Sequence, residues 1–199
     1  EAYRDDCLPI GSVTTDGEGR LLSRGRNRIY SERAVAGHTK GSTLAHAEVE
    51  ALGKVDYDAF DPHTGVLYTT LEPCPMCMGA FYISGFRNIH FAARDPYAGS
   101  VDLLGTTPYL QRKSIQVMPP FDPDLEAVLI ALFMEFELVR SRGRIRETVL
   151  YRRWREVVPA GVALGEQLAQ TGEIRRQRLD LSAEMAYDWL MESVQDSFG

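Results

Sequence analysis

Two short motifs, His46-Ala47-Glu48 and Pro73-Cys74-Pro75-Met76-Cys77, constrain this chain more than any other feature of its sequence. Two cysteines separated by two residues can direct both sulfur atoms toward one point when the second lies in the first turn of a helix. The N–H groups at that helix end favour the thiolates that bind zinc. His46, Cys74 and Cys77 would supply three ligands, which leaves the fourth position of tetrahedral zinc for water, as in catalytic sites.

Glu48 follows the histidine by two residues, and we interpret it as a proton carrier rather than as a fourth ligand. Zinc lowers the pKa of bound water toward about 7, so zinc-bound hydroxide is available at neutral pH to attack an amino-bearing ring carbon. Glu48 would deliver the protons with which ammonia leaves. The two motifs together therefore predict hydrolytic deamination.

Taken alone, a Cys-x-x-Cys pair also occurs in redox pairs and in structural zinc sites. A structural site needs a fourth cysteine or histidine at short spacing, and Cys7 and the three other histidines stand apart from the motifs. A structural site also has no use for the Glu48 carboxylate, so the combination favours catalysis. A zinc-stabilised binding module without catalytic activity is the alternative.

The spacing of His-x-Glu and Pro-Cys-x-x-Cys resembles the cytidine deaminase-like superfamily, in particular its guanine deaminases, cytosine deaminases and tRNA adenosine deaminases. The resemblance runs from about residue 9 to residue 117. It implies a zinc cofactor, an α/β fold with three layers (α/β/α) around a central mixed five-stranded sheet, and a homodimer. The matching positions outside the two motifs are Pro9-Ile10-Gly11, Gly25-Arg26-Asn27, Glu72, Gly79-Ala80, Asp95 and Gly99.

The resemblance also implies residues that contact the substrate. The asparagine of a Gly-x-Asn motif does so in the family, which makes Asn27 a candidate; a local turn-forming side chain is the alternative. The backbone N–H near Ala47 or Cys74 is a second candidate. Relatives fold the loop that corresponds to residues 95–100 over the mouth of the active site. Tyr97 is therefore a candidate for stacking on a base, with ordinary packing as the alternative.

Two short segments bear on the substrate. Ile83-Ser84-Gly85 stands where tRNA adenosine deaminases carry His-Ser-Arg, whereas Pro75-Met76 is similar to guanine and related small-substrate deaminases. We therefore expect a small-molecule substrate, a free nucleobase or nucleoside with a guanine-type purine ahead, and a role in purine metabolism. Deamination of adenosine to inosine in tRNA is the alternative.

Hydrophobic periodicity predicts alternating strands and helices in the first 120 residues. Apolar and β-branched runs bounded by turn residues indicate strands, and apolar residues at helical spacing indicate helices. The expected strands are Ile10–Thr15, Arg20–Ile29, Gly65–Leu71, Asn88–Ala93 and Ser114–Met118, the expected helices Ala45–Lys54 and Met76–Ser84, and the expected loops Ser31–Ser42 and Asp56–Thr64.

The proline-rich run at residues 119–123 ends this pattern, so we expect a deaminase core at 1–120 and a helical extension at 121–199. The extension would pack on the core or at a subunit interface. Further helices are expected at 145–157 and 164–190, with Pro159 and Gly161 between them. An apolar helical stripe offers a surface for a second subunit and consists of Leu125, Val128, Leu129, Leu132, Phe133, Phe136 and Val139.

Charge is divided unevenly along a chain whose net charge is −6. Residues 140–178 hold ten arginines and four glutamates, or +6. Such an arginine belt either contacts RNA phosphates or forms a solvated helix face paired with acidic residues of its own chain. The negative overall charge favours the second interpretation, so nucleic acid is a possible but not a favoured partner.

Composition and the chain's first residues indicate where such a protein works. Hydrophobic residues make up 44% and charged residues 25%, which suits a globular core. Three cysteines, two of them assigned to zinc, provide no disulfide framework. No apolar run reaches the ~18 residues of a membrane span, and the first residues lack a signal-peptide profile. We expect a cytoplasmic protein with no membrane contact.

Overall fold

The computed structural model describes the backbone of residues 1–31 and 42–198, and the side chains of these residues up to Val194. The chain forms two compact units, Glu1–Pro120 and Phe121–Gly199. The loop expected at Ser31–Ser42 lies largely outside the described residues. Within the described part of the chain, no helix combines the length and the apolar character needed to cross a bilayer.

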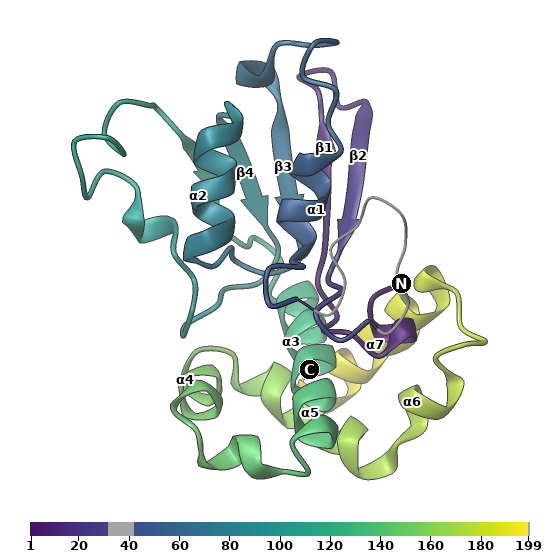
Figure 1. Ribbon diagram of the computed structural model, residues 1–199. Helices are drawn as coiled ribbons and strands as arrows, with labels where there is room; N and C mark the ends of the chain where they lie inside the picture. Colours follow the sequence, from purple (N-terminus) through teal and green to yellow (C-terminus); the bar gives the residue numbers. More distant parts are fainter. Residues whose placement is uncertain (32–41, 199) are drawn as a thin grey trace. The chain divides into compact units, whose positions relative to one another are not determined.

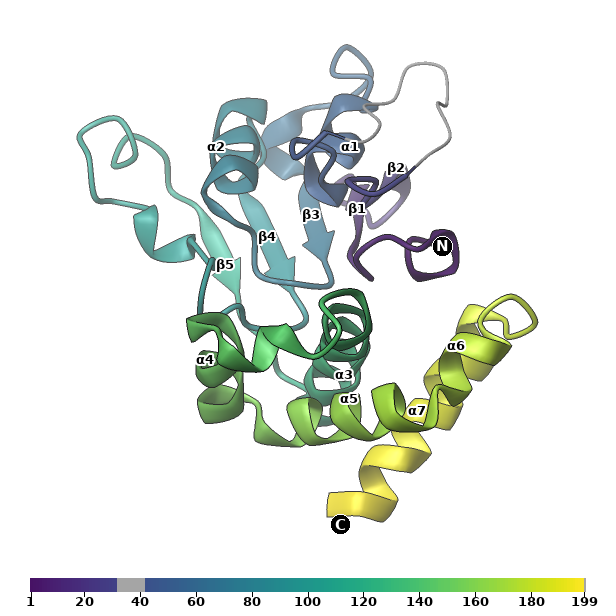
Figure 2. The same ribbon diagram turned by 60° about the horizontal axis from the view of Figure 1, so that its bottom comes forward.

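The first unit is built on a five-stranded mixed sheet with the strand order β2-β1-β3-β4-β5 (Figure 2). β1 pairs antiparallel with β2 and β3, whereas β3, β4 and β5 run parallel. The expected α/β class, with a mixed five-stranded sheet and helices in the C-terminal part, is confirmed. The strands are β1 (Gly11–Thr15), β2 (Leu21–Arg26), β3 (Val66–Thr69), β4 (Asn88–Phe91) and β5 (Gln116–Met118).

Every strand is shorter than the sequence predicted, and after β2 the chain leaves the sheet toward the first motif. Beyond β2, the N–H of Asn27 still bonds to the carbonyl of Ile10, but the next N–H, of Arg28, bonds to the carbonyl of Ala45. The tight turn between β1 and β2 is confirmed. The Asp16 carboxylate accepts the N–H groups of Glu18 and Arg20, both at 2.9 Å.

Helices α1 (Ala47–Gly53) and α2 (Pro75–Ser84) lie on the same side of the sheet (Figure 1). Side chains alternate across β3 and β4, so every second residue faces these helices. Gly85, with a φ of 98°, ends α2 in the left-handed conformation that favours glycine. The apolar core of this unit consists of Leu52, Val55, Leu67, Met78, Phe81, Phe86 and Ile89.

Strand β2 and helix α1 approach each other at Gly25. A Cβ atom at this position would lie 2.0 Å from the carbonyl oxygen of Ala47 and 2.5 Å from the nitrogen of Ala51. Ser23, on the same strand, donates its hydroxyl to the carbonyl of Ala51 at 2.6 Å. Only glycine permits this distance, so Gly25 sets the position of α1 on the sheet.

The first unit also contains three short 3₁₀ helices, and the second unit is entirely helical. Within the second unit, α3 packs against α5 and α7. The 3₁₀ helices are η1 (Tyr3–Asp5), η2 (Pro62–Thr64) and η3 (Val101–Leu103), and the second unit comprises α3 (Pro123–Arg140), η4 (Arg144–Glu147), α4 (Val149–Val157), α5 (Pro159–Thr171), α6 (Glu173–Gln177) and α7 (Ala183–Phe198).

The segment expected to be helical at 164–190 is largely helical, but it is divided among three helices, α5, α6 and α7. Gly172, with a φ of 62°, separates α5 from α6. Pro159 and Gly161 lie inside α5 instead of between two helices. Proline is compatible with the first helical position, where its missing N–H costs nothing.

The predicted apolar stripe on α3 was only partly right. Ile130 and Met134, outside the stripe, are fully buried, whereas Val139, inside it, is 38% exposed. Gly161 and Gly165 allow α5 to contact α3 closely: a Cβ at Gly165 would lie 2.6 Å from the Cβ of Met134. Of the predicted stripe itself, Phe133 packs on Trp154 of α4, with ring centres 4.7 Å apart, so another helix of the same unit covers part of the surface that the sequence offered to a second subunit.

We expect Gly165→Ala to destabilise the second unit, because the added methyl group meets α3 where neither helix backbone can easily move. The expected loss is about 1–3 kcal/mol of unfolding free energy. Gly79→Ala is the control, since a Cβ there meets nothing within 4 Å and alanine improves helix propensity by up to ~1 kcal/mol. Urea unfolding followed by circular dichroism measures both; equal effects would contradict the close packing of α3 and α5.

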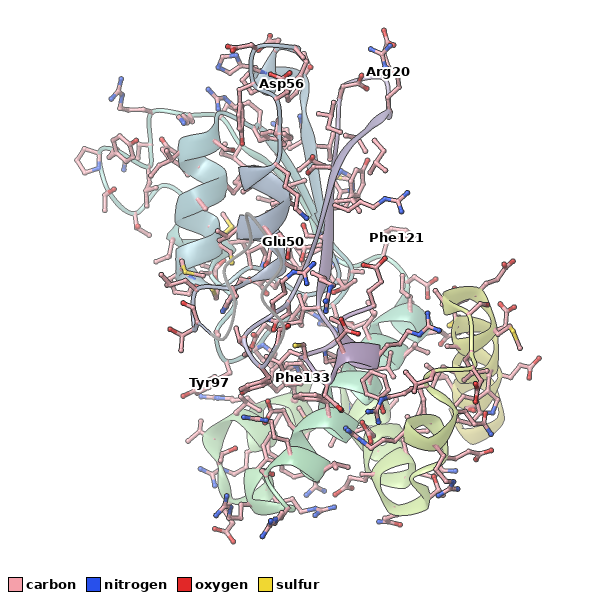
Figure 3. The ribbon with its side chains drawn as sticks, turned by 45° about the vertical axis from the view of Figure 1, so that its right-hand side comes forward. Arg20, Glu50, Asp56, Tyr97, Phe121 and Phe133 are labelled. Atoms are coloured by element: carbon pink, nitrogen blue, oxygen red, sulfur yellow. The ribbon has the colours of Figure 1, made fainter. Side chains whose placement is uncertain are left out.

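The carboxyl group of Glu50 on α1 forms ion pairs whose effect on stability depends on pH (Figure 3). Burial raises the pKa of this carboxyl, but bonds from Arg28 at 2.8 Å and Lys54 at 2.5 Å outweigh burial and lower the pKa from 4.5 to about 2. A lowered folded-state pKa means that the ion pairs stabilise the fold above pH 4.5, and that this stabilisation disappears as the pH falls through about 2.

Glu50→Gln should therefore be less stable than the wild type at pH 7, with a difference that shrinks between pH 4.5 and pH 2. Urea midpoints measured across this range provide the test. A difference independent of pH would mean that Glu50 stabilises α1 by packing and not by charge.

Candidate metal and active site

His46 stands at the N-terminal end of α1 as its capping residue, with extended backbone angles (φ −86°, ψ 151°). The loop before it is fixed by two backbone bonds. Arg28 donates its N–H to the carbonyl of Ala45 at 2.9 Å, and His46 donates its own to Leu44 at 2.8 Å. Glu48 lies in the first turn of the same helix and is 3% exposed. Both side chains are thus held where α1 begins.

The two cysteines occupy the equivalent end of α2. Cys74 is the capping residue, Pro75 is the first helical residue, and Cys77 lies in the first turn. The chain just before them is fixed on two sides. Glu72 donates its N–H to the carbonyl of Ala93 at 2.8 Å, and the carbonyl of Pro73 accepts the N–H of Ser100 at 3.0 Å. The parallel pairing of β3 with β4 therefore positions the first cysteine.

The three predicted ligands converge. Nδ1 of His46 lies 3.4 Å from Sγ of Cys77 and 3.7 Å from Sγ of Cys74, and all three ligand atoms lie within 4.8 Å of one another. Tetrahedral zinc with ordinary bond lengths separates a sulfur ligand from a nitrogen ligand by about 3.5 to 3.6 Å. Two thiolates and one imidazole also suit zinc chemically. The residues present therefore fit this ion.

Hydrogen bonds within the cluster favour a negative charge on the Cys74 thiol and disfavour one on the Cys77 thiol. Bonds from Cys77 and then from His46 lower the pKa of Cys74 to about 4. The bond to Cys74 and burial raise the pKa of Cys77, because two adjacent thiolates repel each other. The bond to Cys74 also raises the pKa of His46. A thiolate is thus present at neutral pH, as cation binding requires.

The Glu48 carboxyl group adjoins this cluster. Its Oε2 accepts the S–H of Cys77 at 3.4 Å, and its Oε1 accepts the hydroxyl of Thr69 at 3.4 Å. Burial raises the pKa of Glu48, which suits a group that exchanges protons near neutral pH. Sequence reasoning missed Thr69. Its only signal is the alternation of β3, which places Thr69 on the same face as Leu67.

Asn27 is completely buried at the end of β2. Its Oδ1 accepts the N–H of Ile29 at 3.1 Å, which is the local turn that the sequence left open. Its Nδ2 is buried and has no hydrogen-bond partner among the residues that the structure describes. A buried donor without a partner costs about 1–3 kcal/mol, so this N–H group is available to an acceptor that reaches it.

The other two candidates are placed differently. Ala47 is completely buried between His46 and Glu48, and its carbonyl faces Gly25. The side chain of Tyr97 is 58% exposed on the loop after β4 (Figure 3). The structure thus brings the three ligands and Glu48 together, and it leaves the Tyr97 ring in solvent.

Glu72 fixes the loop that carries Tyr97, a role that the sequence did not indicate. Its carboxyl group accepts the N–H groups of Asp95 at 3.2 Å and of Val101 at 3.4 Å. A Cβ at Gly99 would lie 2.4 Å from the Glu72 carboxyl carbon, so glycine is required for this contact. Burial raises the pKa of Glu72 and of Asp95.

The proteins that are similar to this chain have names that refer to several different substrates. A tRNA-specific adenosine deaminase of Agrobacterium fabrum is 35% identical over 97 residues, which cover 49% of this chain and 59% of the relative. A cytosine deaminase of Candida albicans is 31% identical over 107 residues, 52% of this chain and 65% of the relative. A guanine deaminase of Bacillus subtilis is 33% identical over 87 residues, 43% of this chain and 50% of the relative.

The chain spans less than two thirds of the length of each of these relatives. These relatives are all named as deaminases, and a family model does the same for this chain: the model of the MafB19-like deaminases matches residues 1–120. This match covers more than half of the chain and includes the whole His46, Cys74, Cys77 and Glu48 cluster. The chain therefore belongs to the MafB19-like deaminase family.

Proposed function

We propose that the protein is a zinc-dependent hydrolase that deaminates a free nucleobase or nucleoside, with a guanine-type purine as the first candidate. The observation that carries the proposal is the cluster of His46, Cys74 and Cys77 with the Glu48 carboxyl group at 3.4 Å from one of the sulfurs. Residues 1–120, which contain this cluster, would carry the reaction.

In this proposal His46, Cys74 and Cys77 hold the zinc ion. Zinc, when bound, acts as a Lewis acid that makes water a nucleophile at neutral pH. Glu48 accepts a proton from the attacking water and delivers protons to the ring nitrogen and to the departing amino group. Water thereby adds to the ring carbon, the carbon–nitrogen bond breaks, and ammonia leaves. Thr69 holds the carboxyl group in place through its hydroxyl.

Asn27 would orient the ring through its unpaired Nδ2, which can donate to a ring nitrogen or carbonyl oxygen. The backbone N–H near Ala47 would contact the oxygen of the product, and Tyr97 would stack on the base from its exposed loop. Of these three contacts, that of Asn27 has the strongest support, because its donor is both buried and without a partner.

The preference for a small substrate rests on Ile83-Ser84-Gly85 and Pro75-Met76, and a relative named guanine deaminase supports it. Deamination of adenosine in tRNA is the second candidate, supported by the relatives named tRNA-specific adenosine deaminase. A binding module without catalytic activity is disfavoured, because it would gain nothing from a buried carboxyl group beside the ligands. The homodimer and the cytoplasmic location stay predictions.

Removing a ligand tests the metal assignment. We expect Cys74→Ala to weaken zinc binding by more than the roughly 10- to 100-fold that is typical of changes to groups around a ligand set. Cys7→Ala is the matched control, because Cys7 is a fully buried thiol of the same unit outside the cluster. Zinc per chain, measured by elemental analysis after dialysis against a weak chelator, should fall only in Cys74→Ala. Equal zinc content in both variants would refute the assignment.

Replacing the proposed proton carrier tests the reaction. Glu48→Gln should retain zinc and lower turnover by about 10²- to 10⁴-fold, because general acid–base catalysis contributes this much. Ammonia release from the zinc-loaded protein is measured with guanine, adenine, cytosine, their nucleosides, aminated pterins and triazines, and a tRNA anticodon stem-loop. Glu18→Gln, on the exposed β1–β2 turn, is the control and should retain full turnover.

Release from one small molecule would support the first candidate, and release from the stem-loop alone would support the second. Turnover that persists in Glu48→Gln would overturn the role of this residue. No release from any substrate, with zinc bound, would favour the binding module.

A further inference from the structure

One strongly charged surface plays no part in the proposed reaction. The segment from residue 140 to residue 155, which includes η4 and most of α4 in the second unit, holds seven arginines and one glutamate. Lysine is absent from it. The arginines are Arg140, Arg142, Arg144, Arg146, Arg152, Arg153 and Arg155.

Packing of three apolar residues turns these arginines toward solvent. On α4, Tyr151 and Trp154 are 4% and 1% exposed, and the Trp154 ring lies 4.7 Å from that of Phe133. On η4, Ile145 is 5% exposed. The remaining positions of both elements therefore face outward, and all seven arginines are exposed. We call the exposed arginines of η4 and α4, with the preceding Arg142, the arginine surface.

Within the described residues, two of the six arginines of the arginine surface form ion pairs with carboxylates of the chain. Arg146 pairs with Glu166 at 3.0 Å and Arg153 with Glu156 at 3.3 Å. Arg142, Arg144, Arg152 and Arg155 form no ion pair with a carboxylate among the residues that the structure describes. Instead, Arg144 and Arg152 donate to backbone carbonyls, and Arg155 lies 5.9 Å from the centre of the Tyr151 ring.

A hollow of about 380 Å³ adjoins this surface. Its floor is mainly apolar, and Arg155 stands at its edge. Glu166 borders it as well, but its carboxylate already accepts the Tyr151 hydroxyl at 2.6 Å and Arg146 at 3.0 Å. The hollow is large enough for a flat ring, and it is lined by Arg155, Pro159, Ala160, Val162, Ala163 and Glu166.

The free energy that each kind of contact contributes indicates which class of partner suits this surface. An exposed ion pair with another protein contributes only about 0–1 kcal/mol, so a protein partner needs apolar anchors. Among the residues of η4 and α4, which carry the arginine surface, Val149 is the one large apolar residue that is exposed, at 50%. A nucleic acid needs no such anchors, because each phosphate that binds an arginine releases counterions. The guanidinium group also matches phosphate with two parallel hydrogen bonds.

We propose that the arginine surface binds single-stranded nucleic acid, with phosphates on Arg142, Arg144, Arg152 and Arg155 and an unstacked base in the adjoining hollow. The nine residues of α4 span ~13 Å, long enough to follow several nucleotides of one strand. Proteins that bind single strands stack unpaired bases on aromatic rings or on the planes of arginine side chains, and Arg155 offers such a plane beside the apolar floor. This binding does not depend on the proposed deamination, and it is measured without turnover.

The experiment compares two triple variants of the full chain with the same change in charge. The first is Arg142→Gln, Arg152→Gln and Arg155→Gln. The matched control is Arg24→Gln, Arg176→Gln and Arg112→Gln. Like Arg142, Arg24 is exposed; like Arg152, Arg176 donates to a backbone carbonyl; and like Arg155, Arg112 lies over a tyrosine ring. Binding to fluorescein-labelled 20-nucleotide RNA, DNA of the same sequence, and its duplex is followed by fluorescence anisotropy at several salt concentrations.

The first variant should bind the single strands roughly a hundredfold more weakly at 0.1 M salt, because three phosphate contacts at about 0.7 each reduce the salt slope by about 2. The control should bind as the wild type does. Binding of RNA alone, or of RNA and DNA alike, identifies the natural ligand. Ala163→Leu, which fills the hollow, should weaken binding by about tenfold without changing the salt slope.

Three results would overturn the proposal. One is equal weakening in both triple variants, which would mean attraction by net charge alone. The second is absence of binding at low salt, or binding of the duplex in preference to the single strands. The third is a fall in sedimenting mass in the first variant only, which would assign the arginine surface to a second copy of the chain.

Discussion

The contact of β2 with α1 at Gly25 is the constraint on which the site depends. Because a Cβ there would lie 2.0 Å from the Ala47 carbonyl, the strand and the helix approach more closely than any other residue allows. α1 carries His46 at its cap and Glu48 in its first turn, so the position of this one helix places the proposed ligand and the proposed proton carrier together. Bonds from Ser23 and Arg28 hold the helix at that distance.

The cysteines reach the same point by an independent route, through the parallel pairing of β3 and β4. Both helices therefore begin at the cluster, and their unpaired N–H groups stabilise negative charge there. This explains how the buried Cys77 thiol and Glu48 carboxyl group lie beside the half-buried Cys74 thiol. The bond to Cys74 raises the pKa of Cys77 and burial raises the pKa of Glu48, and a bound cation would favour the ionised form of both groups.

Features that depend on near neighbours in the sequence were predictable. The turn capped by Asp16, the end of α2 at Gly85 and the cysteine in the first helical turn all follow from local chemistry. Features that depend on distant residues were not. Thr69 bonds to Glu48 across 21 positions of sequence, and α3 buries Met134 because Gly165, 31 positions later, lets α5 approach. Nothing in α3 itself indicates which of its sides α5 will cover.

The same division explains why the reaction is easier to infer than its substrate. The proposed chemistry needs only His46, Cys74, Cys77 and Glu48, which two local motifs supply, and proteins named for guanine, cytosine and tRNA adenosine are all similar to this chain. Residues outside the two motifs must therefore select among these substrates. Asn27 offers one buried donor, which any of these rings can satisfy. Under the proposed function, the loop that Glu72 fixes, with its exposed Tyr97, is the next candidate for selecting among these rings.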